Sequence, residues 1–136
     1  MPAFRINIAT GSGTPIYRQI GDQVRLAVAT GDLPPGHAMP SVRSLAEQLL
    51  LNANTVAKAY GELVRDGVLE SQQSLGFFVA SKRQIYSRAE RLRRLRHAVD
   101  EFIHEAVFLD FTAEEICQAV EEKLAALDWG AKTTGD

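Results

Sequence analysis

Apolar residues recur at helical spacing in two neighbouring segments near the middle of the chain. The first stripe consists of Val42, Leu45, Ala46, Leu49 and Leu50. The second consists of Val56, Ala59, Tyr60, Leu63 and Val64. Ser41 and Asn52 each stand just before a stripe, and both residue types cap helix N-termini. The pattern therefore predicts two short helices with a tight break at residues 51–53, which is a helix-turn-helix.

The polar face of the second predicted helix carries groups that suit DNA. Asn54, Thr55 and Lys58 lead this face. An asparagine amide pairs with adenine, a threonine contacts a thymine methyl group or a base edge, and a lysine binds guanine or phosphate. The same residues would also suit the solvated face of any surface helix, so the flanking sequence has to decide between the two interpretations.

A hairpin is predicted directly after this helix. Gly67 is typical of a residue that ends a helix. Two β-prone runs follow at residues 68–71 and 77–80, and a polar tip that contains a glycine, residues 72–76, separates them. A hairpin that follows a recognition helix is the wing of a winged helix, so the flanking sequence favours DNA binding.

Two segments precede the helix-turn-helix. The alternating run at residues 4–8 predicts a short strand or an arm that packs on the domain or a partner subunit; a flexible terminus is the alternative. Pro15 then opens a helix at its first position, and Gly31 ends it. The apolar stripe of this helix consists of Ile16, Ile20, Val24, Ala27 and Val28. We interpret the helix as scaffold and Tyr17 as a packed ring rather than a DNA contact.

Two amphipathic helices are predicted after the wing. The first covers about residues 83–109, and its apolar side consists of Ile85, Ala89, Leu92, Leu95, Val99, Phe102, Ile103 and Ala106. The second begins at Thr112, where Glu115 completes a capping box, and its apolar side consists of Ala113, Ile116, Cys117, Val120, Leu124 and Leu127. Two such helices cannot enclose a core, so we expect a homodimer formed through them, with Cys117 buried.

Charge is segregated along a chain whose formal net charge is only −2. Residues 82–96 hold seven basic residues and one acidic residue, whereas residues 97–136 hold ten acidic residues and two lysines. We expect Lys82 and Arg83, which adjoin the wing, to bind DNA phosphates. The later arginines are expected to pair with acidic residues, either on their own helix, as Arg96 with Asp100, or on a partner subunit.

Composition excludes several other classes of protein. The chain of 136 residues has room for one domain and a small appendage, and its single cysteine argues against a disulfide framework and predicts a cytoplasmic location. No uncharged run approaches the roughly 18 residues of a membrane span, and no signal peptide is recognisable. No nucleotide loop, zinc-ligand pattern or nucleophile–base pair is present, so neither an enzyme nor a cofactor is expected. His97 and His104 lie on one helix face, and we interpret them as a solvated or packed pair rather than a metal site.

Residues 15–80 resemble the N-terminal domain of the GntR family of bacterial transcription regulators. The matching residues are Pro15-Ile16-Tyr17-x-Gln19-Ile20, Gly31-Asp32-Leu33-Pro34-Pro35-Gly36, Pro40-Ser41-Val42-Arg43-x-Leu45-Ala46, Asn54-Thr55-Val56-x-Lys58-Ala59-Tyr60, Leu63, Gly67, Leu69-Glu70 and Gly76-x-Phe78-Val79. The Asn-x-Asn-Thr-Val-x-Lys-Ala-Tyr form and the short tail are most similar to the YtrA subfamily. The resemblance implies a cytoplasmic, dimeric repressor that binds a double-stranded operator, with transporter operons among its possible targets.

The resemblance also implies which residues bind DNA. It adds Arg43, which could instead pair with Glu47 one turn later on the same helix. The full set expected at the DNA is Ser41, Arg43, Asn52, Asn54, Thr55, Lys58, Gln73, Gly76, Lys82 and Arg83. Two positions depart from the family, because Ala53 and Ala57 stand where many members have arginines. The wing departs as well, since residues 74–76 carry no basic side chain.

These observations predict a mainly α fold with a small β wing. Residues 1–81 are expected to form a winged helix-turn-helix DNA-binding domain with an N-terminal arm, and residues 82–136 a two-helix dimerisation region. The expected function is a sequence-specific DNA-binding regulator that acts on an inverted-repeat operator. Two alternatives stay open: a winged helix that binds proteins instead of specific DNA, and a scaffold that senses a small-molecule effector.

Overall fold

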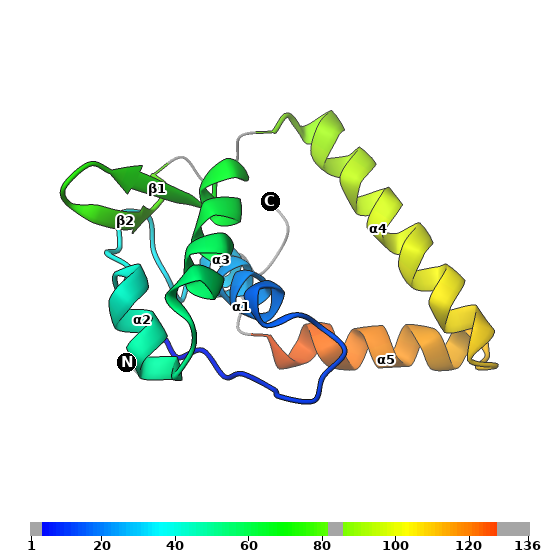
Figure 1. Cartoon of the computed structure of the whole chain (residues 1–136). Helices are drawn as coiled ribbons and strands as arrows, with labels where there is room; N and C mark the ends of the chain where they lie inside the picture. Colours follow the sequence, from blue (N-terminus) through cyan, green and yellow to red (C-terminus); the bar gives the residue numbers. More distant parts are fainter. Residues whose placement is uncertain (1–3, 82–85, 128–136) are drawn as a thin grey trace. The chain divides into compact units, whose positions relative to one another are not determined.

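The computed structural model describes residues 4–81 and 86–127, which form five helices and one hairpin (Figure 1). The elements are α1 (Ile16–Thr30), α2 (Val42–Leu49), α3 (Ala53–Arg65), β1 (Leu69–Gln72), β2 (Gly76–Val79), α4 (Arg88–Phe108) and α5 (Ala113–Ala126). The predicted mainly α fold, a winged helix-turn-helix followed by two helices, is confirmed. Contacts divide the described residues into two units, residues 4–81 and residues 86–127.

The core of the first unit forms where α1 and α2 pack against α3. Ile20 and Val24 of α1 and Val56 and Leu63 of α3 are completely buried there. Tyr60 lies among them, and its hydroxyl donates a hydrogen bond of 2.8 Å to the carbonyl oxygen of residue 40. Burial raises the pKa of the Tyr60 hydroxyl, so this donor stays protonated. The inner face of α3 is therefore anchored along its length.

Local residue chemistry sets the ends of the helices, largely as predicted. The Ser41 hydroxyl accepts the Ser44 amide at 3.0 Å, and the Asn52 side chain accepts the Asn54 amide at 2.7 Å. Gly67 has a φ of 76° just after α3, as expected of a residue that ends a helix. Leu50, however, was wrongly assigned to the apolar stripe. It ends α2 in the left-handed conformation and is 92% exposed, because the tight turn takes its side chain off the buried face.

The N-terminal arm is extended and packs on α1 without forming a strand. Ile6 is buried in the core. The side chain of Gln23 bonds both the amide and the carbonyl of residue 7, at 2.9 and 2.7 Å, and the side chain of Gln19 does the same for residue 9, at 2.8 and 3.1 Å. Two glutamines one turn apart thus pair with the arm as a neighbouring strand would, which supports the packed-arm interpretation over the flexible terminus. Pro15 immediately precedes α1 instead of occupying its first position.

The wing is an antiparallel pair in which residue 69 faces residue 79 and residue 72 faces residue 76. Its strands are shifted by one residue from the predicted limits, so Gln72 and Gly76 belong to the strands. Residues 73–75 make the turn, in which Ser74 has a φ of 70°, and Gly76 begins β2 with a φ of 110°. The segment before α2 pairs with the other edge of β2, where the Met39 amide donates to the Phe77 carbonyl at 2.9 Å. The start of α2 is thereby fixed beside the wing.

The second unit consists of α4 and α5, which meet at a turn and diverge from it (Figure 1). The capping box of Thr112 and Glu115 is confirmed, with bonds of 3.0 and 3.1 Å. The first helix was predicted to begin near residue 83. It begins at Arg88, because the Ser87 hydroxyl accepts the Glu90 amide at 3.1 Å and caps it there; residues 82–85 lie outside the described part of the chain.

Candidate nucleic-acid interface

The first turns of α3 present polar side chains outward. Asn54 and Lys58 are exposed and one turn apart, and Thr55 between them is half-buried. The opposite face of α3 carries the buried core residues, so Asn54 and Lys58 are not part of the core. Asn52 is exposed, but its side-chain oxygen is already used by the Asn54 amide. Asn54 and Lys58 thus have the geometry that a helix needs to enter a major groove.

Lys58 makes a contact that the sequence did not reveal. Its ammonium nitrogen lies 4.0 Å from the centroid of the Tyr17 ring, which belongs to the first turn of α1. The Tyr17 ring packs against the core, as predicted for it. No signal in the sequence links these two positions, because they lie on separate helices that meet only in the folded chain.

The first turn of α2 carries Arg43, whose side chain is 91% exposed. One guanidinium nitrogen lies 3.8 Å from a carboxylate oxygen of Glu47, whose side chain is 75% exposed. Both interpretations of Arg43 therefore fit: it pairs loosely with Glu47, and it is free to exchange this partner for DNA, since so exposed a pair contributes little. Ser41, just before α2, is exposed and its hydroxyl hydrogen can still be donated.

The tip of the wing is neutral. Gln73 and Leu75 are exposed, the latter 71%, and Gly76 brings the backbone around the turn at a φ of 110°. The wing and the start of α2 adjoin through the bonds of residues 37–39 to β2, whereas Asn54 and Lys58 begin the next helix. Lys82 and Arg83, the expected phosphate contacts after the wing, lie outside the described residues.

The second unit exposes the apolar residues that were expected at a dimer interface. The exposed fractions are Leu92 36%, Leu95 58%, Val99 46%, Phe102 42%, Ile103 37%, Val120 37% and Leu124 46%, and Ile116 is half-buried. Near the turn, α4 and α5 line a cavity of about 480 Å³ whose walls include Phe102, Ile116 and Phe111. Ala106 alone among the described residues of this unit is buried. The unit thus leaves open the surface that would normally be a core.

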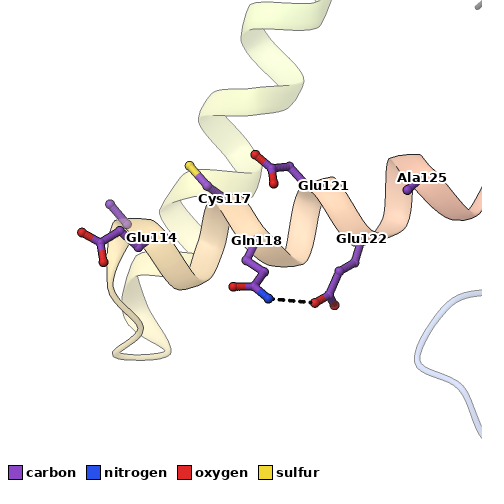
Figure 2. A pocket seen from close by; sticks show the side chains of 7 residues that line it. Glu114, Cys117, Gln118, Glu121, Glu122 and Ala125 are labelled. Carbon is purple, nitrogen blue, oxygen red and sulfur yellow. Dashed lines mark hydrogen bonds between the residues drawn. The ribbon is translucent and has the colours of Figure 1, made fainter.

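Cys117 was expected to be buried, and this is wrong for the single chain. The thiol is exposed on α5, between the carboxylates of Glu114 and Glu121 (Figure 2). Its position is at the margin of the apolar stripe, next to a shallow pocket on the acidic side of the helix, where Gln118 donates to Glu122 at 3.3 Å. Helical periodicity alone did not separate the margin of the stripe from its centre.

The arginines at the start of α4 bind their own helix in part. Glu90 accepts hydrogen bonds from Arg93, at 3.0 and 2.6 Å, and from Arg94, at 2.8 Å. These bonds lower the pKa of the Glu90 carboxyl to about 2, the bond from Arg93 contributing most. The expected pair of Arg96 and Asp100 is not among the ion pairs of the described residues; His97 instead lies 3.1 Å from Glu101.

No cluster of three metal-binding side chains occurs in the part of the chain that the structure describes. None of the described helices combines the length and the apolar character that crossing a bilayer requires.

Comparison with known proteins supports a DNA-binding role. The family model for bacterial regulatory proteins of the gntR family matches residues 16–79. The transcriptional repressor YtrA of Bacillus subtilis is 31% identical over 127 residues, which cover 93% of this chain and 98% of the repressor. Both the DNA-binding segment and the tail are therefore similar in the two proteins.

Solved structures show the same likeness. The structure of a transcriptional antiterminator from Listeria monocytogenes matches with a TM-score of 0.83 and 31% identity, over 98% of this chain and all of that one. The AraR DNA-binding domain in complex with its operator ORX1 matches with a TM-score of 0.51 and 26% identity, over 59% of this chain and all of that domain. A domain of this fold thus occurs bound to operator DNA.

Proposed function

The chain belongs to the gntR family of bacterial regulatory proteins, in its YtrA-like subfamily, and we propose that it is a homodimeric repressor that binds an inverted-repeat operator. That it is a DNA-binding regulator of transcription and not an enzyme follows from the family. We assign residues 1–81 to DNA binding and residues 82–136 to dimerisation. A protein that binds the bacterial chromosome acts in the cytoplasm, so we expect this one there. The resemblance implies an operon with transporter genes as its target.

The observation that carries the proposal is the outward face of α3. Asn54 and Lys58 are exposed one turn apart, while the other face of the helix is fixed in the core by Tyr60 and Leu63. A rigidly held helix with an amide and an ammonium at its leading end can read base edges in a major groove. Arg43 at the start of α2 is the second base-reading candidate, because its side chain is almost fully exposed.

Four further residues are proposed to hold the DNA backbone or to shape the contact. The Ser41 hydroxyl can still donate its hydrogen to a phosphate. Thr55 is half-buried beside Asn54 on α3, where it can shape the surface that meets DNA. Gln73 and Gly76 form the tip of the wing, which can follow the neighbouring groove. Because this tip has no basic side chain, we expect it to contribute less affinity than α3, with Lys82 and Arg83 supplying the charge beside it.

Dimerisation is proposed through the apolar residues of α4 and α5. A second copy would cover the exposed stripe and fill the 480 Å³ cavity between the helices. Charge supports a second copy over a small-molecule effector as the occupant. Residues 88–96 hold five arginines and one glutamate, whereas α5 holds four glutamates and one lysine, so the start of α4 on one subunit complements α5 on the other.

Symmetry then determines the form of the operator. Two recognition helices related by a two-fold axis fit an inverted repeat, with half-sites about one helical turn apart. Footprinting on the DNA upstream of the protein's own gene should locate such a repeat. Equal affinity for one half-site and for the whole repeat would contradict the symmetric dimer.

The role of α3 is tested with single substitutions on the footprinted operator and on a scrambled duplex. We expect Arg43→Ala and Asn54→Ala each to cost about 1–3 kcal/mol on the operator and to relax the preference for particular base pairs. Lys82→Ala and Arg83→Ala should weaken binding to both duplexes and lower the salt slope by about one unit each. Glu47→Ala is the matched control, since it removes the partner of Arg43 but no DNA contact.

The result also separates the proposal from its alternatives. Equal losses on both duplexes for Asn54→Ala would show that α3 does not read bases. Absence of any salt-sensitive DNA binding by the folded wild-type dimer would favour a winged helix that binds protein. A melting temperature that rises with an added small molecule, at unchanged dimer concentration, would assign the cavity to an effector instead of the second copy.

A further inference from the structure

The side chain of Lys58 is held by a ring from another helix. Its ammonium nitrogen lies 4.0 Å from the centroid of the Tyr17 ring, within the distance at which an aromatic face attracts a cation. The ring is itself fixed, because Tyr17 is half-buried and packs against the core. Lys58 remains exposed. A flexible cation on the recognition helix is thus restrained by a rigid ring on α1.

The ring decides which partner Lys58 has. Glu62 lies one turn further along α3, at the spacing where a lysine and a glutamate often pair. Among the described residues no ion pair joins Lys58 to Glu62; the Lys58 ammonium lies over the Tyr17 ring instead. A cation over a ring keeps its charge, whereas a cation paired with a carboxylate is neutralised. Tyr17 therefore keeps the charge of Lys58 available to DNA.

The same contact limits what Lys58 can reach. The ammonium lies over a ring in the first turn of α1, where Arg18 is also exposed, although Asn54 and Lys58 share one face of α3. Near α1 the accessible part of a duplex is its sugar-phosphate backbone, because base edges lie deep in the groove that α3 enters. A charge in this place adds affinity but does not distinguish sequences.

We propose that Tyr17 is a positioning residue that holds the Lys58 ammonium for a backbone phosphate, so that Lys58 anchors the recognition helix without reading a base. The inference rests on the proposed entry of α3 into the major groove. It removes Lys58 from the base-reading set and gives the Tyr17 ring a role in DNA binding although the ring itself need not touch DNA.

The experiment is a double-mutant cycle on the full-length protein with Tyr17→Leu, Lys58→Met and both together. Each variant is titrated against operator and scrambled duplex at several salt concentrations. Lys58→Met should weaken both duplexes by the same factor and lower the salt slope by about one per subunit. Tyr17→Leu should weaken both by about two- to fivefold per subunit, the worth of an exposed cation–ring contact. The double variant should bind no more weakly than Lys58→Met alone.

Tyr17→Phe is the matched control, because it keeps the ring face and removes the hydroxyl. We expect it to bind as the wild type does. A loss equal to that of Tyr17→Leu would show that the hydroxyl contacts DNA directly and would overturn the inference. Additive losses in the double variant, or a change of base preference in Lys58→Met, would overturn it as well.

A spectroscopic measurement keeps the inference testable should Tyr17→Leu unfold. In the wild-type protein the methylene protons next to the Lys58 ammonium should show an upfield ring-current shift, which Tyr17→Phe preserves; absence of this shift contradicts the contact. Asn54→Ala distinguishes a failure of the proposed role of α3 from a failure of the positioning of Lys58 by Tyr17. If it and Lys58→Met both leave operator binding unchanged, the role of α3 fails; if it weakens binding while Tyr17 and Lys58 act independently, only this inference fails.

Discussion

The two units of the chain treat their apolar residues in opposite ways. In residues 4–81 the apolar stripes of α1 and α3 are largely buried, with Tyr60, Leu63 and Ile20 completely shielded from solvent. In residues 86–127 comparable side chains are open to solvent, Leu95 to 58% and Phe102 to 42%. The first unit therefore buries enough apolar surface to fold alone. The second has the apolar stripes of a core, but its two helices do not cover them.

The number of layers explains this difference. Three helices, a hairpin and an arm surround one another in the first unit, whereas α4 and α5 share only the neighbourhood of their turn. Two diverging helices cannot close a core, so their apolar stripes need a partner. Stability and assembly are thus separated along the chain: the DNA-binding unit is expected to fold alone, and the tail is expected to fold fully only with a second copy.

Removal of the tail gives the largest expected effect. A chain shortened to residues 1–81 should remain folded but monomeric in sedimentation, whereas we expect the full chain to sediment as a dimer. Its operator affinity should fall by about 10²–10⁴, because the second recognition helix is no longer tethered to the first. A folded, dimeric short chain would contradict the division of roles between the units.

A charge placed in the apolar stripe tests the same division without deletion. Ile103→Glu should raise the dissociation constant of the dimer at least about 100-fold, since an unpaired charge buried in an interface costs about 3–5 kcal/mol. His104→Glu is the control, because it adds the same charge at the next residue, which points away from the stripe by helical geometry. Equal effects of the two substitutions in analytical ultracentrifugation would place the interface elsewhere.

The core of the first unit is tested with Tyr60→Phe. The ring and its edge-on contact with Phe77, at 4.9 Å between centroids, should persist, but the carbonyl of residue 40 would lose its partner. Because residue 40 is exposed and water can replace the lost donor, we expect a loss of about 0.5–1.5 kcal/mol in the free energy of unfolding, the net contribution of one hydrogen bond. Tyr17→Phe, at a half-buried ring, should cost little in the same denaturant titration. Similar losses for both would mean that the bond of Tyr60 is not what stabilises the unit.

The sequence predicted the regular part of the fold because its signals are local. Caps such as Ser41 and Thr112, the glycine after α3 and the stripe of α1 act within a turn or two, and the structure confirms them. The assignment of Leu50 to the apolar stripe was wrong because helical periodicity assumes that the helix continues. The helix ends at Leu49, and the left-handed turn at Leu50 takes its side chain off the buried face. The Cys117 thiol is exposed in the single chain, because periodicity shows a stripe but not how far its margin is covered; its burial in a dimer stays a prediction.

The candidate site was predictable where residue type and position suffice, as with Asn54 at the leading end of α3. The contact of Lys58 with Tyr17 was not predictable, since it depends on how α1 crosses α3. The pairing of the arm with Gln19 and Gln23 was not predicted either. The side-chain amides of these glutamines take the place of a neighbouring strand, and no sequence pattern indicates such a partner.

The smallest expected effect concerns Glu90, in the basic segment at the start of α4. Hydrogen bonds from Arg93 and Arg94 lower the pKa of this carboxyl to about 2 in the folded chain, below the ordinary value of about 4.3 in an unfolded one. A lowered pKa means that the ionised form is favoured by folding. The stabilisation is therefore complete above about pH 4.3 and is lost as the pH falls toward 2.

This pair contributes little to stability because its side chains are largely in solvent, Arg93 to 68%. Glu90→Gln should slightly lower the melting temperature at neutral pH, and the difference from the wild type should shrink as the pH falls from about 4.3 toward 2. A carbon-detected NMR titration of the Glu90 carboxyl gives the midpoint directly. The Arg93→Ala, Arg94→Ala double variant should return it to the ordinary range. A wild-type midpoint already in that range would show that Arg93 and Arg94 do not bind Glu90. These arginines would then be available to DNA or to a partner subunit, and DNA binding would no longer be confined to the first unit.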